Sequence, residues 1–127
     1  PVKFLKANLV LDLKPIIENH RIAADLFLPD DASTADIENL GERLQGESYL
    51  AYLEMLFVVR PRPPLVTTPI AIVVGSADRI FSVTEERRTA RAYGADAIVV
   101  DGAAHDLMLG PRWEAAAEAV AVAAARF

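Results

Sequence analysis

The stretch Pro69-Ile70-Ala71-Ile72-Val73-Val74-Gly75-Ser76-Ala77-Asp78 decides how the second half of this chain folds. Residues 69–74 form a continuous apolar run that is rich in β-branched side chains and closed by a glycine. Such a run is typical of a short strand buried on both faces. Residues 97–100, with the sequence Ala-Ile-Val-Val, repeat the pattern and predict a second buried strand.

Helices are predicted after each of these strands. Ser82 and Glu85 stand at capping-box spacing, which predicts a helix from Val83 to about Tyr93 that stops at Gly94. Pro111 is placed in the first turn of a last helix that reaches Arg126. The inner stripe expected for this last helix consists of Trp113, Ala117, Val120 and Ala124. The order strand, helix, strand, helix predicts an α/β fold with a right-handed parallel βαβα unit.

The first half of the chain has a different pattern. Apolar residues recur at helical spacing within residues 16–27 and 49–57, and Ser33 with Asp36 predicts the start of a further helix over about 35–44. The proline-rich segment 60–64 favours an extended connector after these helices. The sequence therefore divides into a helical segment, residues 1–64, and an α/β segment, residues 65–127.

Composition excludes several classes of protein. The 127 residues are 53% hydrophobic and 24% charged, as in a single globular domain, and the net charge of −5 argues against nucleic acid as a partner. No run reaches the roughly 18 apolar residues of a membrane span, and the absence of cysteine suits a reducing compartment, so we expect a cytoplasmic protein. Because the two histidines lie in different halves and no glycine-rich nucleotide motif occurs, no metal and no cofactor are predicted.

The candidate chemistry lies where the two predicted strands end. Loops at the carboxyl ends of neighbouring parallel strands converge on one edge, so Asp78 and His105 are expected to reach hydrogen-bonding distance. A carboxylate that accepts from one imidazole nitrogen leaves the other free to take a proton from a nucleophile. Singly, Asp78 could be a turn residue and His105 a donor to a carbonyl group. His20 lies on an apolar helix stripe and is interpreted as structural.

Residues 67–127 resemble the C-terminal third of an α/β-hydrolase. The resemblance rests on the stretch 69–79 and on Gly102-Ala103-Ala104-His105-Asp106-Leu107-Met108. One departure is Ala104, because many members of the family have glycine directly before the histidine. It implies that Asp78 is the triad acid and His105 the triad histidine. Residues 1–64 then resemble the helical cap of such enzymes, with Leu53, Met55, Leu56 and Phe57 as candidate substrate-binding residues of the lid.

The family's nucleophile motif, Gly-x-Ser-x-Gly, does not occur in the sequence. In a sheet of only two parallel strands, both strands are also edge strands with unpaired backbone groups. We therefore expect a partial fold whose nucleophile lies upstream, completed by the N-terminal half of the fold or by a second chain, and inactive by itself. The expected reaction is hydrolysis of a small ester or related acyl substrate. A dehalogenase or an epoxide hydrolase of the same fold, and a non-catalytic interaction module, are the alternatives.

Overall fold

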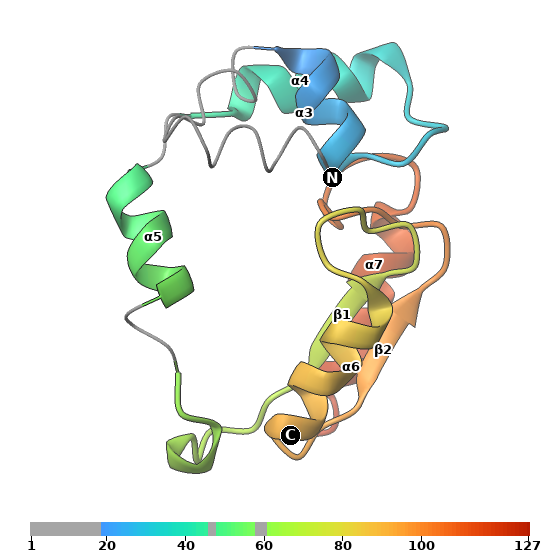
Figure 1. Ribbon diagram of the computed structural model, residues 1–127. Coiled ribbons are helices and arrows are strands. Elements are labelled where there is room, and N and C mark those ends of the chain that lie inside the picture. Colours follow the sequence, from blue (N-terminus) through green and yellow to red (C-terminus); the bar gives the residue numbers. More distant parts are fainter. Residues whose placement is uncertain (1–18, 46–47, 58–60) are drawn as a thin grey trace.

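The structure is a computed structural model that describes residues 19–45, 48–57 and 61–127 (Figure 1). It is a mixed α/β arrangement in which helices come first and a small parallel sheet follows. The elements are α3 (His20–Phe27), α4 (Thr34–Arg43), α5 (Tyr49–Phe57), the 3₁₀ helix η1 (Pro63–Leu65), β1 (Ile72–Gly75), α6 (Val83–Ala92), β2 (Ala97–Val100) and α7 (Trp113–Ala124). The helical periodicity near residues 16 and 17 falls outside the described residues.

Strands β1 and β2 form a parallel pair whose register runs from Ile72 opposite Ala97 to Gly75 opposite Val100. The second strand matches its prediction, whereas the first begins three residues later than expected. The ladder begins at Ile72, which lies opposite Ala97, the first residue of β2. Val74 and Val100 are buried, while the other side chains of the strands are only half-buried, so burial on both faces is incomplete among the described residues.

The two helices of the α/β segment lie on the sheet, with α6 in front of the strands and α7 behind them in Figure 1. The capping box of α6 is confirmed: the Ser82 hydroxyl accepts from the backbone of Glu85, whose carboxylate accepts from the Ser82 backbone. The helix ends before Gly94, which has a left-handed φ of +69°. Between Ile72 and Val100 the chain therefore follows the predicted strand, helix, strand order.

Helix α7 differs from its prediction at both ends and in its inner face. It ends at Ala124, two residues before the predicted end at Arg126. It begins at Trp113, so Pro111 lies in the turn before the helix and not in its first turn. The expected inner stripe is wrong, since Trp113, Ala117, Val120 and Ala124 are exposed, whereas Ala116 and Ala123 are 4% exposed and face the core. In a helix with so many alanines, periodicity identifies no single apolar face, and the small side chains let the backbone approach the sheet.

In the helical segment, α3 and α4 pack together through the buried residues Ala23, Ala24, Leu28 and Leu40. The predicted cap of α4 is confirmed as a reciprocal Ser33 and Asp36 capping box. His20 is exposed at the start of α3, and its ring lies over Gly41 of α4, where a Cβ would come within 2.4 Å of Nδ1. His20 is therefore not buried on an apolar stripe, in contrast to the expectation, and its structural role stays a prediction.

Helix α5 stands apart from the sheet and from the other helices (Figure 1). The connector after it is expected to be extended, but Pro63 to Leu65 form one 3₁₀ turn. A membrane-crossing helix, long and apolar enough to span a bilayer, is not found in residues 19–45, 48–57 and 61–127.

Candidate functional site

The loops that leave β1 and β2 are joined along their backbones. The Ser76 amide donates to Val100 at 3.0 Å, and the Ala77 amide donates to Ala103 at 2.8 Å. Only glycine fits at the junction, because a Cβ on Gly75 would lie 2.1 Å from the Ala103 carbonyl oxygen. The parallel pairing of the strands therefore continues into the loops that carry the candidate residues.

The hydroxyl of Ser76 makes a second link between the loops. It donates to Asp101 Oδ1 at 3.0 Å and accepts from the Gly102 amide at 2.8 Å. Gly102 has a φ of +70°, a conformation that favours glycine, and turns the second loop back toward the first. This serine is thus a structural residue of the loop junction.

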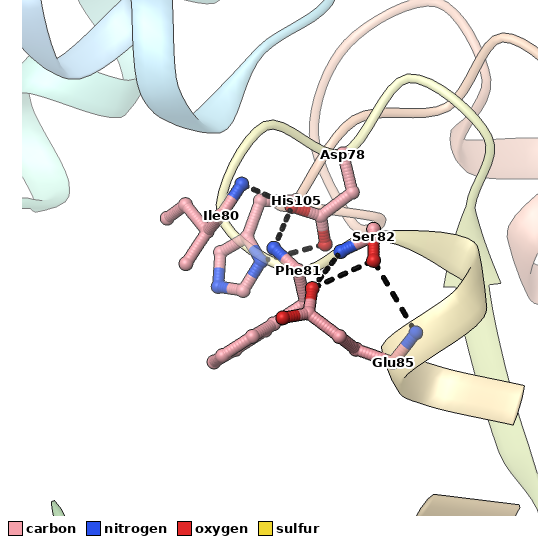
Figure 2. A network of polar contacts seen from close by, with 6 residues as sticks. All are labelled: Asp78, Ile80, Phe81, Ser82, Glu85 and His105. Carbon is pink, nitrogen blue, oxygen red and sulfur yellow. Dashed lines mark hydrogen bonds and ion pairs between the residues drawn. The ribbon is translucent and has the colours of Figure 1, made fainter. Parts of the chain in front are cut away.

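Asp78 and His105 meet above this junction, as the sequence predicts. Asp78 Oδ2 lies 2.9 Å from His105 Nδ1 (Figure 2). The other carboxylate oxygen, Oδ1, accepts from the amides of Ile80 at 2.7 Å and Phe81 at 2.9 Å. Asp78 is therefore both the turn residue and the histidine partner, one oxygen serving each role. With its side chain 7% exposed, its orientation is fixed from three directions.

The His105 ring lies close to two phenylalanine rings. The centroid of Phe27, from α3, is 5.6 Å from that of His105, and the centroid of Phe81 is 5.5 Å away. The His105 side chain is 29% exposed, so it is sheltered without being sealed. Among the described residues no hydrogen-bond partner contacts Nε2, which leaves this nitrogen available to a further group.

An open hollow of about 160 Å³ adjoins the pair. Its lining combines apolar side chains with the two titratable residues and with one further carboxyl group, from α6. The lining residues are Val73, Val74, Gly75, Asp78, Phe81, Glu86, His105 and Leu107. Ligands of open parallel sheets bind at this edge, beyond the carboxyl ends of the strands.

Glu86 is a site residue that the sequence interpretation missed. The run Glu85-Glu86-Arg87-Arg88 is expected to be a solvated helix face, but Glu86 is half-buried and lines the hollow. Burial raises the pKa of its carboxyl group, and the charges of Asp78 and Glu85 raise it further, while His105 opposes them. The signal that could have found it is its place in the first turn of the helix that directly follows the Asp78 loop.

All four serines of the sequence have structural hydrogen bonds. Ser33 and Ser82 cap helices, Ser48 accepts from the Ala51 amide at 3.3 Å, and Ser76 joins the loops. None of them is bonded to His105. These residues therefore supply an acid and a base but no serine positioned as a nucleophile.

Two of the candidate lid residues, Leu53 and Phe57, are not brought to the pair. They lie on α5, which Figure 1 places away from β1 and β2, and neither Leu53 nor Phe57 lines the hollow. The side chains of Met55 and Leu56 lie outside the described residues, so their assignment stays a prediction. In the described part of the chain, Phe27 and Phe81 supply the apolar surface next to His105. No group of three or more metal-ligating side chains occurs within those same described ranges.

No family model, no curated protein and no solved structure matches this chain. The geometry of the site itself therefore indicates its chemistry. That geometry is a carboxylate fixed on one nitrogen of an imidazole, with a hollow of mixed polarity beside it and no partner for the second nitrogen among the described residues.

Proposed function

We propose that Asp78 and His105 are the acid and base of a hydrolytic triad in an enzyme of the α/β-hydrolase class, acting on an ester or related acyl substrate. One observation carries the proposal: Asp78 Oδ2 lies 2.9 Å from His105 Nδ1, while Nε2 has no partner among the described residues. A carboxylate in this position holds the imidazole in the tautomer with the proton on Nδ1. The lone pair of Nε2 is then able to accept a proton.

In the proposed reaction, His105 Nε2 removes the proton of a nucleophilic hydroxyl as its oxygen bonds to the acyl carbon. The imidazolium that forms is stabilised by Asp78, which stays ionised. When the bond to the leaving alkoxide breaks, Nε2 returns the proton to that oxygen. Water then attacks the acyl-enzyme in the same way: Nε2 removes a proton from the water and returns it to the oxygen of the nucleophile, which releases the carboxylic acid product.

The nucleophile is proposed to come from a part of the fold beyond these residues. Two observations support this: every serine of the sequence has a structural hydrogen bond, and each strand of the two-stranded sheet has an unpaired edge among the described residues. A parallel sheet is normally continued by further strands and covered on both faces. A strand paired with the free edge of β1 would bring its own terminal loop toward the hollow beside His105. The helical segment is proposed to be the cap, and its α3 already contributes Phe27 to the site.

Hydrolysis of p-nitrophenyl acetate and butyrate tests the proposal, in protein that contains these residues together with the nucleophile-bearing part of the fold. We expect His105→Ala to lower kcat by about 10⁴-fold, because removing a member of such a triad has an effect of that order. His20→Ala is the matched control, since it removes the only other histidine and should leave kcat unchanged. Full activity of His105→Ala would refute the assignment.

The same pair also serves enzymes of this fold that have an aspartate nucleophile. The pair itself is common to both types of nucleophile, so substrates decide between them. Turnover of esters and labelling by a fluorophosphonate would assign a serine enzyme. Turnover of a haloalkane or an epoxide without such labelling would assign a dehalogenase or an epoxide hydrolase. If no substrate turns over and the chain binds another protein through its strand edges, it is an interaction module.

A further inference from the structure

The last turn of α3 holds both loops of the candidate site. The Asp25 carbonyl accepts from Arg79 at 2.8 Å, next to Asp78 in the chain. The Phe27 carbonyl accepts from the Asp106 amide at 2.9 Å, next to His105. Between these two contacts, Leu26 is buried against the side chain of Ile80. Residues 25–27 thus together contact both loops: the first two contact the Asp78 loop and the third contacts the His105 loop.

The chemistry of a helix end explains why these carbonyls are available. The last four carbonyl groups of a helix have no intrahelical donor and need partners elsewhere. For Asp25 the donor would be the residue four positions on, which is Pro29 and has no N–H group. The guanidinium of Arg79 fills this place, and a cation is also favoured there by the helix dipole.

Arg79 has a second anchor just beyond the helix. Its Nη1 bonds the Asp25 carbonyl, while its Nη2 forms an ion pair with the carboxylate of Asp30. The planar guanidinium can bridge two acceptors at once, which a lysine ammonium on a flexible stem does less well. The Arg79 side chain is 38% exposed and that of Asp30 is 90% exposed, so the contact with the Asp25 carbonyl is expected to contribute more than the ion pair.

We propose that Arg79 is a positioning residue that fixes the geometry of the Asp78 and His105 pair by clamping the Asp78 loop to α3. The same helix holds the His105 loop through the Phe27 carbonyl and packs the Phe27 ring beside the imidazole. The position of α3 and the length of the Asp78 to His105 hydrogen bond are therefore coupled. Only the catalytic consequence of this inference rests on the proposed function.

Nuclear magnetic resonance on the full 127-residue chain tests the clamp without any assay of activity. The observable is the exchange of the His105 Nδ1 proton with water, compared between the wild type and Arg79→Met. Arg112→Met is the matched control, because Arg112 also bridges to the loop after α3, at 2.9 Å from Asp31, with a similarly exposed side chain. Far-ultraviolet circular dichroism verifies that each variant is folded.

We expect Arg79→Met to lose the slowly exchanging Nδ1 signal, Arg79→Lys to retain it in part, and Arg112→Met to retain it fully. Wild-type exchange in Arg79→Met, or equal loss in Arg112→Met, would overturn the proposal. If Arg79→Met does not fold, Arg79→Lys decides: faster exchange than in the wild type supports the clamp, and unchanged exchange overturns it.

In protein that contains the nucleophile, a clamp of this kind affects kcat more than KM. A displacement of about 1 Å at a catalytic group can reduce the rate by about 10²-fold, so we expect Arg79→Met to lower kcat by about 10- to 100-fold. Lost Nδ1 protection without any hydrolysis by the wild type would refute the proposed function and leave the clamp intact. Normal protection in Arg79→Met, with hydrolysis that depends on His105, would refute the clamp alone.

Discussion

The imidazole of His105 and the carboxylate of Asp78 lie 2.9 Å apart although 27 positions separate them in the chain. Two short parallel strands in register bring them together, and backbone hydrogen bonds carry that register into the loops. The contact therefore depends on the sheet as much as on the two side chains. Changes to the loop junction should disturb the pair even where they touch neither residue.

Asp78→Asn is expected to preserve the turn and abolish the proton transfer. The amide oxygen can still accept from Ile80 and Phe81, but the amide nitrogen would donate to His105 Nδ1 and shift the ring proton to Nε2. In protein with its nucleophile, kcat should fall by about 10⁴-fold. Asp106→Asn is the control, since this neighbouring carboxylate bonds only the Met108 amide at 3.2 Å among the described contacts. A similar loss in both variants would point to a general charge effect.

Gly75→Ala is expected to separate the two loops. The added Cβ would lie 2.1 Å from the Ala103 carbonyl oxygen, which is backbone and cannot move without breaking the junction. We expect a loss of about 3 kcal/mol in the free energy of unfolding, as for severe overpacking of a core. The control is Gly94→Ala, where the added Cβ would have open space around it and only the left-handed φ of +69° is unfavourable. This variant should lose about 1 kcal/mol in the free energy of unfolding. Urea unfolding measures both, and equal losses would contradict the account.

Glu85 and Glu86 are neighbours on α6 with opposite effects on the pH dependence of stability. The pKa of Glu86 is raised above its ordinary 4.5, chiefly by burial, so its contribution is favourable at low pH and is lost as the pH rises through the folded value. Glu86→Gln should therefore be more stable than the wild type at neutral pH and equal to it at about pH 3. The comparison requires urea unfolding at both pH values, and a less stable variant at neutral pH would contradict it.

Glu85 shows the reverse behaviour. Hydrogen bonds from the Ser82 hydroxyl and the Ser82 backbone lower its pKa, so its contribution is present above 4.5 and is lost as the pH falls through the folded value. Glu85→Gln is expected to be less stable than the wild type at neutral pH, with the difference shrinking in acid. If the difference grew in acid, the capping carboxylate would not be ionised in the folded state.

The features that the sequence predicts well are those that depend on local chemistry. Both capping boxes, the stop at Gly94 and the second strand follow from residues close to one another in the chain. The meeting of Asp78 with His105 also follows, because parallel strands bring their carboxyl ends to one edge. In the local cases one short segment contains enough information to define its own geometry, whereas the contact of Asp78 with His105 follows from the general arrangement of parallel strands.

The features that the sequence does not predict depend on contacts between distant segments. Phe27 belongs to an apolar helix pattern that indicates a core residue, and nothing local shows that its ring and carbonyl hold the His105 loop. The pattern of α7 indicates the wrong inner face, because alanines occur on all sides of this helix. Ala116 and Ala123 are buried only because the helix packs on the sheet with that side. Glu86 belongs to a charged run that indicates a solvated helix face, and its half-burial depends on the other residues that line the hollow.

The tautomer of His105 is the sharpest test of its pairing with Asp78. Nitrogen chemical shifts of the imidazole, recorded on the full chain with the ring in its neutral form, report which ring nitrogen has the proton. The account predicts a proton on Nδ1, directed at Asp78, and a bare Nε2, with Asp78→Asn moving the proton to Nε2. A proton on Nε2 in the wild type, or a tautomer that does not respond to Asp78→Asn, would contradict it.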